Sequence, residues 1–299
     1  MLPNYLAKRR VIVTPPPLDC IIAASLLLRE YRSEGLEPLL IINSIDYLRN
    51  LRLTSNYALL CIRDEFKDKI REGEEPLFLN INERFGGVFV WRKGGFTPLE
   101  LIEPPPKSMT KLMSQILKVT SSQVEVLASI VEGRYSGLTI EDLSKASLTA
   151  LLNISNFYKI VELILEGNLN GFKALIDELV ESYGRDEARY VAEIKGKSMR
   201  LRNYVLIYYD VYSKERIYVS EVIDEFINEG YKGFIILGSR GDKVVKIELI
   251  NLNMRDKLAI KSRLSGFIED EIVVGDIDKL YLRYPFPNLH ELIKIVLRI

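Results

Sequence analysis

The stretch that decides the fold is VIVTPPPLDCIIAASLLL, which runs from Val11 to Leu28. Its first part, VIVT, is β-branched throughout and favours a strand that is buried on both faces. After three prolines, the apolar run CIIAASLLL is typical of a buried helix. Asp19 stands where it can cap that helix at its N-terminus, and Gly35 can end it in a left-handed conformation. The stretch therefore predicts a strand, a tight turn and a buried helix.

The turn of this unit consists of Pro15, Pro16 and Pro17. In α/β proteins the first turn between a strand and a helix commonly holds a ligand, because free backbone N–H groups and the helix dipole point there. Each proline removes one of these donors, and the glycines of a phosphate-binding loop are absent from the turn. We expect the architecture of a binding turn without the chemistry that cradles phosphate.

Length and composition narrow the class of protein. A chain of 299 residues favours two domains, and 47% hydrophobic with 27% charged residues is the composition of a soluble globular protein. The 41 basic residues balance the 41 acidic ones, so the chain has no overall charge that would attract nucleic acid. No apolar run is long enough to cross a bilayer, and the N-terminus lacks the apolar core of a signal peptide. We expect a cytoplasmic protein without membrane contact.

Cysteine and histidine usage limits the chemistry further. Cys20 and Cys61 lie in apolar settings, and we expect reduced, buried thiols rather than a disulfide or a zinc site. The single histidine, His290, belongs to the predicted last helix, where we expect a surface position. Two-metal hydrolysis needs several carboxylates and imidazoles that converge on the ions. The sequence therefore predicts no metal site and no cofactor.

Beyond the first helix, apolar runs alternate with helical segments. Further strands are predicted at 39–42, 57–62, 77–79 and 88–91. A short helix is expected after Ser44, and Gly86 and Gly87 are expected in the turn before the last of these strands, which is antiparallel or at an edge. Alternation of this kind indicates a doubly wound parallel sheet.

Three consecutive prolines at 104–106 mark a boundary, after which apolar residues recur at helical spacing as far as Val180. Ser122 and Glu125 form a capping box for one of these helices. The C-terminal part mixes strands with a helix that Ser220 caps. The predicted C-terminal strands are 204–209, 233–237 and 244–250. We therefore predict an α/β domain over 1–120, a helical connector over 121–190 and a smaller α/β domain over 191–299.

The opening stretch resembles the first motif of the DHH phosphoesterases, the RecJ-like superfamily. In that motif an apolar strand is followed by (S/T)-H-x-D-x-D-G and a helix of small residues. Here Thr14 matches, whereas Pro15 stands for the histidine. Pro17 stands for the first aspartate and Cys20 for the glycine. Asp19 alone survives among the metal ligands. The resemblance implies a DHH-like α/β domain whose metal site is vestigial.

Later positions depart from the family in the same way. Asp64 follows the third strand, where it stands for the aspartate of the second motif or is a solvated residue of a charged stretch. At the fourth strand, LFLNINERFGG replaces the DHH signature. The C-terminal part resembles the small DHHA-type domain, but its strand KVVKIELIN lacks the arginine that grips substrate. Ser265-Gly266-Phe267 is at most a remnant of the glycine-rich loop. The resemblance implies that catalysis has been lost.

A degenerate member of the RecJ-like superfamily works in the replicative helicase of archaea and eukaryotes, bound to GINS and MCM. This chain is similar to an archaeal version of it, so the resemblance implies a non-catalytic DNA replication factor with GINS and MCM as partners. Three alternatives stay open. They are a stand-alone single-stranded nucleic-acid-binding protein, a metal-dependent DHH exonuclease or phosphoesterase, and an unrelated α/β binding protein whose triple-proline turn imitates the motif.

One local sequence is suited to single-stranded nucleic acid. Lys195, Lys197, Arg200 and Arg202 crowd into IKGKSMRLR, and Tyr204 follows. Cations beside an aromatic ring can contact the phosphates of a single strand and stack a base. The same pattern is common on solvated faces next to strands, so both interpretations stay open.

Overall fold

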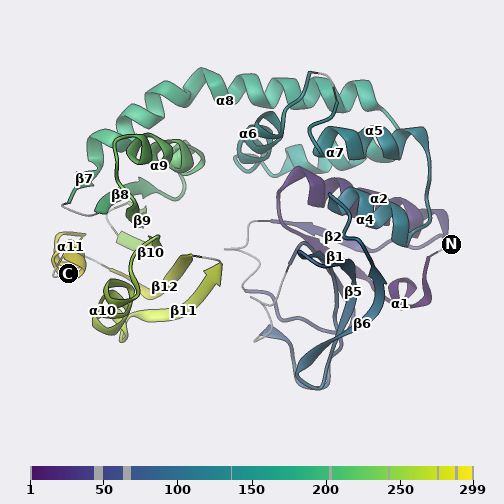
Figure 1. Cartoon of the computed structure of the whole chain (residues 1–299), viewed down its shortest axis with the longest axis horizontal. Helices are drawn as coiled ribbons and strands as arrows, with labels where there is room; N and C mark the ends of the chain where they lie inside the picture. The colour runs from purple at the N-terminus through teal and green to yellow at the C-terminus, as the bar shows by residue number, and fades with distance from the viewer. Residues whose placement is uncertain are drawn as a thin grey trace. The chain divides into compact units, whose positions relative to one another are not determined.

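Two six-stranded sheets carry the fold, one in each of the two units into which the chain divides, Met1–Tyr183 and Gly184–Ile299 (Figure 1). The computed structural model describes residues 2–43, 50–62, 69–135, 137–201, 204–241, 243–274, 276–286 and 289–297. The predicted α/β class is confirmed. Among the described residues, no helix has the length and apolar character needed to cross a membrane.

The sheet of the first unit has the strand order β2-β1-β3-β4-β5-β6. These strands are β1 (Val11–Thr14), β2 (Leu39–Ile42), β3 (Tyr57–Leu60), β4 (Leu77–Ile81), β5 (Gly86–Arg92) and β6 (Gly95–Ile102). β1 pairs in parallel with β2 and β3, and β3 pairs in parallel with β4, as the alternation predicts. β5 and β6 continue the sheet antiparallel, which leaves β6 at its edge. An antiparallel hairpin thus extends the parallel part.

Helix α2 (Leu18–Ser33) packs on one face of this sheet. Ile21, Ile22, Ala23 and Ala24 are fully buried in it, and the two alanines let the helix approach its neighbours closely. Burying a large aliphatic side chain contributes about 1.5–3 kcal/mol. The nearly all-apolar composition of this helix is therefore explained by neighbours on several sides, since α2 packs against both the sheet and other helices.

The other helices that the structure describes in the first unit contribute to the same core as α2. They are α1 (Asn4–Ala7), α4 (Met109–Ile116), α5 (Ser122–Val131), α6 (Ile140–Ala150), α7 (Ser155–Leu165) and α8 (Leu169–Lys197). Leu127, Phe157 and Phe172 of these helices belong to the same apolar core as α2. Most of the segment predicted as a connector therefore packs into the first unit, and α8 carries the chain from the first unit into the second.

The opposite face of the first sheet holds a second apolar cluster. Because side chains alternate along a strand, Val13, Leu59 and Phe78 point away from α2 and pack together. Phe89 and Trp91 of β5 lie against them and are partly buried. The aromatic residues of this sheet thus gather on the face that α2 does not cover.

The second unit has the strand order β11-β12-β10-β9-β8-β7. Its strands are β7 (Met199–Arg200), β8 (Tyr204–Asp210), β9 (Gly233–Arg240), β10 (Lys243–Ile250), β11 (Ile268–Val274) and β12 (Ile277–Phe286). Its helices are η2 (Lys214–Ile217), α9 (Val219–Asn228), α10 (Met254–Leu264) and α11 (Leu289–Leu297). β8 and β9 are parallel and the other pairs antiparallel. Leu206, Ile235 and Ile247 form a core with Ile260 of α10 and Leu292 of α11.

Two predicted helix caps are wrong. The N-cap of α2 is Pro17, so Asp19 lies within the first turn and does not cap its own helix. α9 begins at Val219 without a side-chain cap, which places Ser220 inside its first turn. Both errors have the same cause: a polar residue just before an apolar run has the pattern of a cap, although the helix begins earlier.

Two further local predictions need correction. The cap of α5 is Ser121, which accepts a hydrogen bond from the N–H of Val124, rather than Ser122. Gly86 and Gly87 lie within β5 and not in a turn. The helix expected after Ser44 falls at 44–49, outside the described residues.

Candidate functional site

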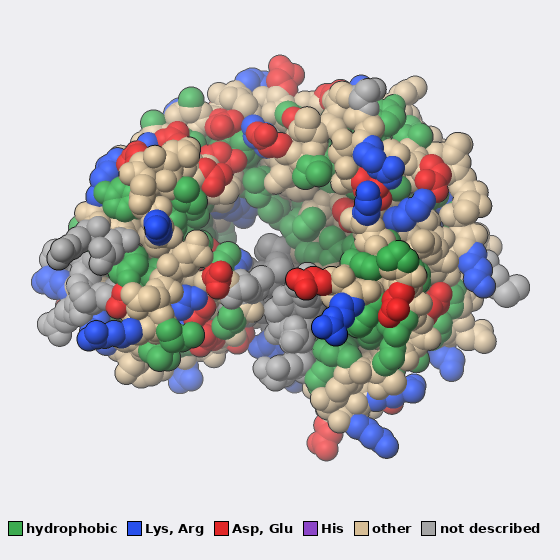
Figure 2. Space-filling model, in the orientation of Figure 1, with side chains coloured by type: hydrophobic (Ala, Val, Ile, Leu, Met, Phe, Trp, Pro, Cys, Tyr) green, Lys and Arg blue, Asp and Glu red, His purple; other side chains and the backbone are tan. Residues whose placement is uncertain are grey.

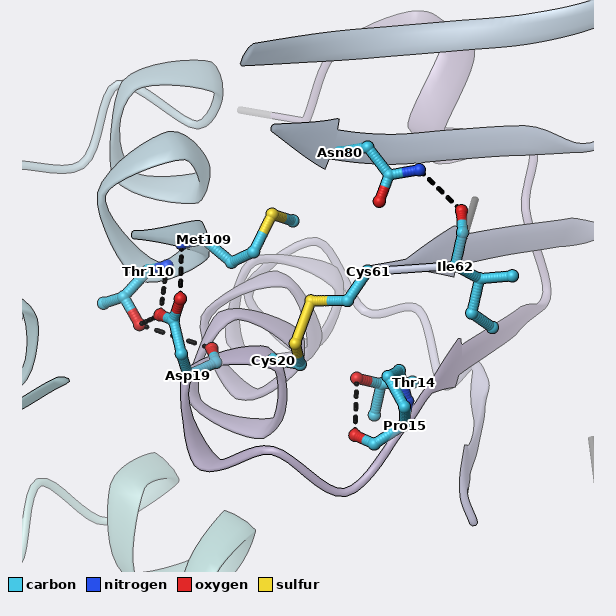
Figure 3. Close-up of a disulfide and its surroundings, with 9 residues drawn as sticks. All are labelled: Thr14, Pro15, Asp19, Cys20, Cys61, Ile62, Asn80, Met109 and Thr110. Carbon is cyan, nitrogen blue, oxygen red and sulfur yellow. Dashed lines mark hydrogen bonds between the residues drawn. A yellow bond between two sulfur atoms is a disulfide. The ribbon is translucent and has the colours of Figure 1, made fainter. Parts of the chain in front are cut away.

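The triple-proline turn joins β1 to α2 and forms the centre of the candidate site (Figure 3). Thr14, the last residue of β1, is fully buried, and its hydroxyl donates to the carbonyl of Pro15 at 3.2 Å. Pro17 follows with extended backbone angles and accepts the first hydrogen bond of α2 from the N–H of Cys20 at 3.0 Å. The three prolines present carbonyl oxygens and no N–H groups, so they offer an anion no backbone donor.

Cys20 and Cys61 form a disulfide, contrary to the expectation of two reduced thiols (Figure 3). The expectation is wrong because β1 and β3 are neighbours in the sheet. The start of α2, which follows β1, therefore lies beside the end of β3, and the two Cα atoms are 6.1 Å apart. Separations of this size are typical of disulfides. In the resemblance, Cys20 takes the place of a glycine, so a covalent bond now occupies this part of the motif.

Asp19 caps a helix other than its own. Its Oδ1 accepts from the N–H of Thr110 at 2.8 Å and from the Thr110 hydroxyl at 2.7 Å, and its Oδ2 accepts from the N–H of Met109 at 2.7 Å (Figure 3). Met109 and Thr110 open α4, whose first N–H groups have no partner within the helix. Ser108 completes the cap by accepting from the N–H of Lys111 at 3.2 Å. The retained aspartate thus fastens α4 to the start of α2.

Burial decides the acidity of this carboxyl group. Removal from water disfavours the charged form and raises the pKa of Asp19. The hydrogen bonds from Thr110 and Met109 favour the charged form and oppose that shift, while the negative charge of Glu132 adds to it. Both carboxylate oxygens are already used as acceptors. A carboxylate has about four lone-pair sites, so capping α4 occupies three of them and leaves one on Oδ2.

The end of β4 replaces the DHH signature with two asparagines. Asn80 donates from its amide to the carbonyl of Ile62 at 2.5 Å, which ties the end of β4 to the chain that follows β3 (Figure 3). The side chain of Asn82 accepts from the N–H groups of Arg84 and Phe85, each at 2.9 Å, and so orders the turn into β5. These amides hold backbone in place where a DHH enzyme would present metal ligands.

No metal site can be assembled from the described residues. Nowhere in the described ranges do three histidine, cysteine, aspartate or glutamate side chains come together closely enough to hold an ion. Asp64, the candidate for the second motif, lies in 63–68, outside the described residues. The backbone of His290 lies in α11 of the second unit, as predicted for the last helix.

Strand β10, where the resemblance implies an arginine that grips substrate, contains lysines and no arginine. On β10 the exposed fraction of Lys246 is 8%, and its ammonium pairs with Glu248 at 2.8 Å. Ser265 ends α10, and the exposed fraction of the nearby Phe267 is 40%. Ser265-Gly266-Phe267 therefore lies at the C-terminal end of α10. The large side chain that this segment exposes is the apolar ring of Phe267.

The predicted basic cluster is brought together, but with acidic partners. Lys195 pairs with Glu225 and, at 3.0 Å, with Glu229. Arg200 also contacts Glu229, at 3.2 Å. These carboxylates raise the pKa of Lys195, first through the hydrogen bond to Glu225, and they offset the local positive charge. Figure 2 likewise shows basic and acidic side chains interspersed over the face in view.

Two other residues of the predicted cluster, Lys197 and Tyr204, also contact acidic side chains. Lys197 pairs with the buried Glu215, and Arg202 lies outside the described residues. The hydroxyl of Tyr204 donates to Asp256 and accepts from the amide of Asn253 at 2.9 Å. Burial and the hydrogen bond to Asp256 raise the pKa of Tyr204 to about 12. The binding of nucleic acid by Lys195, Lys197, Arg200, Arg202 and Tyr204 stays a prediction.

Comparison with known proteins identifies the fold. No family model and no curated protein sequence matches the chain. The exonuclease RecJ bound to manganese superposes with a TM-score of 0.56 at 10% identity, over 99% of this chain and 93% of that one. A pGpG-specific phosphodiesterase from Vibrio gives 0.52 at 11% identity, over 96% of each chain. CDC45 from Entamoeba histolytica gives 0.50 at 8% identity, over 97% of this chain and 95% of that one.

The chain therefore has the fold of RecJ and of other DHH-domain proteins. This confirms the fold that the resemblance implied, including the small α/β unit after the larger one. The structures that share it include an exonuclease, a phosphodiesterase and CDC45. A shared fold does not decide among such different functions, so the function must be argued from the site.

Proposed function

We propose that this chain is a non-catalytic DNA replication factor that uses a RecJ-like fold as a scaffold and binds GINS and MCM in the replicative helicase. One observation carries the proposal. The aspartate that matches the metal-binding motif caps α4 through both of its carboxylate oxygens, and a disulfide follows it directly. These residues stabilise the fold at the place where a DHH enzyme would bind its metal ions.

The proposal is supported by what the fold retains. Both α/β units are present over the length of CDC45 from Entamoeba histolytica, one of the proteins with this fold. When the scaffold persists while the motif residues are replaced, surfaces rather than a reaction become the reason to keep it. Expected features of such a protein are stable contacts with protein partners and no turnover of nucleic acid.

The test is a reconstitution with the full chain. We expect the purified protein to co-elute with purified GINS, and with GINS and MCM together, at moderate salt. In parallel, the protein should release no nucleotides from a single-stranded oligonucleotide in the presence of manganese, under conditions where the RecJ exonuclease does. Manganese-dependent release that increases with protein concentration would contradict the non-catalytic part. Failure to bind either GINS or MCM would contradict the partner part.

A stand-alone single-strand-binding protein is the second candidate. It is favoured by the gathering of Lys195, Lys197 and Arg200 around the end of α8 and β7. It requires that phosphates compete with Glu225 and Glu229 for these cations. Oligonucleotide binding that needs no partner and weakens steeply with salt would support this candidate.

A further inference from the structure

A pocket on the first unit is lined in part by Asn80 and Asn82, the two asparagines that stand in place of the DHH signature. It has a volume of about 300 Å³ and lies on the sheet face that α2 does not cover. Ile81 and four phenylalanines form its apolar walls, and two asparagines form its polar lining. The phenylalanines are Phe78, Phe85, Phe89 and Phe96, and the asparagines are Asn80 and Asn82. The volume is at the lower end of the range for small-molecule sites. It suits a ligand of one or two rings.

The aromatic walls are held in place before any ligand arrives. Phe78 is fully buried at the base, and its ring meets the edge of Phe96 with centroids 5.0 Å apart. Phe85 lies against Phe89, with centroids 5.6 Å apart. The turn that carries Phe85 is fixed by Asn82, which accepts from the N–H of Phe85. Little side-chain order would be lost on binding, which favours affinity.

The polar groups of the pocket are uncharged and complementary. The amide nitrogen of Asn80 is used by the carbonyl of Ile62, and within the described residues its Oδ1 makes no hydrogen bond. The oxygen of Asn82 accepts from Arg84 and Phe85, and in the same ranges its NH₂ group makes none. One acceptor and one donor are thus available beside flat apolar walls. This combination matches the edge and faces of a nucleobase.

The surroundings favour a base that belongs to a polymer. Among the described residues no charged side chain lines the pocket, so a phosphate would have to stay at its mouth. Arg84, in the turn beside Phe85, is exposed, and no carboxylate of the described chain pairs with it. An aromatic platform with a cation next to it is the arrangement that binds single strands, through stacking and phosphate contact.

We propose that this pocket binds a base of a single-stranded nucleic acid, stacked on Phe85 and Phe89, with its edge hydrogen-bonded by Asn80 and Asn82. The inference deepens the proposed function, because a helicase subunit meets unpaired strands, and it rests on that function for the choice of a polymer. It also places the base contact on the first unit rather than at the basic cluster around Lys195.

The fluorescence of Trp91 allows a direct test. It is the chain's single tryptophan, and its ring lies 5.0 Å, centroid to centroid, from Phe96 in the pocket wall. A thymidine oligonucleotide of about 12 nucleotides should quench this fluorescence, whereas an abasic strand with the same number of phosphates should bind far more weakly. Free thymidine separates a nucleoside site from a strand site, since we expect it to bind much less tightly than the oligonucleotide.

Substitutions test whether the aromatic wall of the pocket binds the oligonucleotide. Phe85→Leu keeps an apolar side chain but removes the flat ring, and should weaken oligonucleotide binding about tenfold. Phe267→Leu, which alters an exposed ring of the second unit, is the matched control and should leave binding unchanged. Equal binding of the abasic strand, equal affinity of the Phe85→Leu protein, or equal affinity for free thymidine would each overturn the inference.

The same variants separate this inference from the proposed function. Phe85→Leu protein should still co-elute with GINS and MCM, because the pocket is assigned to a base. If co-elution is lost while oligonucleotide binding is unchanged, the pocket holds a side chain of a protein partner and the base assignment is wrong. If oligonucleotide binding depends on Phe85 but neither partner binds, the proposed function fails and the pocket stands.

Discussion

Asp19 and Thr110 are joined by two hydrogen bonds to a single oxygen, because Oδ1 of Asp19 accepts from both the N–H and the hydroxyl of Thr110, at 2.8 and 2.7 Å. These two residues lie in different helices, α2 and α4, and are 91 positions apart. The residue that looks most like a relic of a metal site is therefore a long-range helix cap. Its role in the fold makes it testable without any assay of function.

Replacing Asp19 with asparagine should destabilise the protein by about 1–2 kcal/mol. Asparagine has one acceptor oxygen, so it can serve Thr110 or Met109 but not both, and one N–H at the start of α4 would be left buried without a partner. Urea denaturation measures the difference. Asp177→Asn, at an exposed position of α8, should change stability by less than about 0.5 kcal/mol. Equal effects of the two substitutions would contradict the capping role.

Because the pKa of Asp19 is raised, we can predict how the stability of the folded protein changes with pH. Because burial makes the folded-state pKa higher than the ordinary value of 3.8, the folded chain binds this proton more tightly than the unfolded chain. Stability should therefore increase, relative to Asp19→Asn, as the pH falls through the raised pKa toward 3.8. Denaturation of both proteins between about pH 7 and pH 4 gives this difference, and a difference that shrinks with falling pH would show a lowered pKa instead.

The disulfide predicts a redox dependence of stability. Cys20 and Cys61 are 41 positions apart, and closing a loop of that length stabilises a folded chain by about 4 kcal/mol in the chain-entropy model. A reducing agent, or the double substitution Cys20→Ala with Cys61→Ala, should lower the free energy of unfolding by about that amount. The double variant should not respond to the reducing agent, which controls for other effects. A wild-type protein equally stable with and without reductant would refute the bond's contribution.

A substitution at Glu229 tests whether the basic cluster binds nucleic acid. Glu229 contacts both Lys195 and Arg200. Glu229→Gln would therefore release Arg200, while Lys195 would keep its pair with Glu225. If phosphates bind there, the oligonucleotide affinity at low salt should rise several-fold, and the slope of affinity against salt should steepen by about one phosphate contact. Asp224→Asn, at an exposed position of α9, is the control. No change in affinity would indicate that the cluster is a solvated, self-neutralised surface.

Alanine substitutions at two glycines, Gly87 and Gly184, should change the stability of the protein in opposite directions. A Cβ at Gly87 would clash with the carbonyl oxygen of Glu100 on β6, so Gly87→Ala should push the two strands apart and cost about 1–3 kcal/mol. A Cβ at Gly184, in α8, would meet no atom within 4 Å. Gly184→Ala should therefore stabilise the protein by about 0.5–1 kcal/mol through helix propensity. Thermal denaturation of the two variants measures the contrast.

The sequence predicts the fold best where local pattern and burial agree. The strand, turn and helix over 11–28, the parallel strands that follow, and the strands at 204–209, 233–237 and 244–250 are all present. In each case a short apolar run is enough, because burial in a sheet is what selects such a run. The RecJ-like fold follows from the same stretch, since the turn and the small residues of α2 survive although the ligands do not.

The candidate site is harder to predict because its contacts are long-range. Nothing near Cys20 in the sequence indicates Cys61, and only the pairing of β1 with β3 brings them together. Asp19 finds its partners in α4. The aromatic pocket escapes prediction because Phe78 and Phe96 come from different strands that share a face. The period-two pattern of β4, compared with those of β5 and β6, is the signal that could have suggested it.

Strand β6 offers an open edge to other molecules, and Leu99 and Leu101 on it are exposed. Exposed apolar edges of this kind are templates on which copies of a protein can stack into fibres. Pro98 lies in the middle of β6 and has no N–H to donate. Pro98 therefore contributes no donor to the ladder of β6, either toward β5 or toward a strand added by another copy. Proline on an edge strand is one of the means by which proteins limit such stacking.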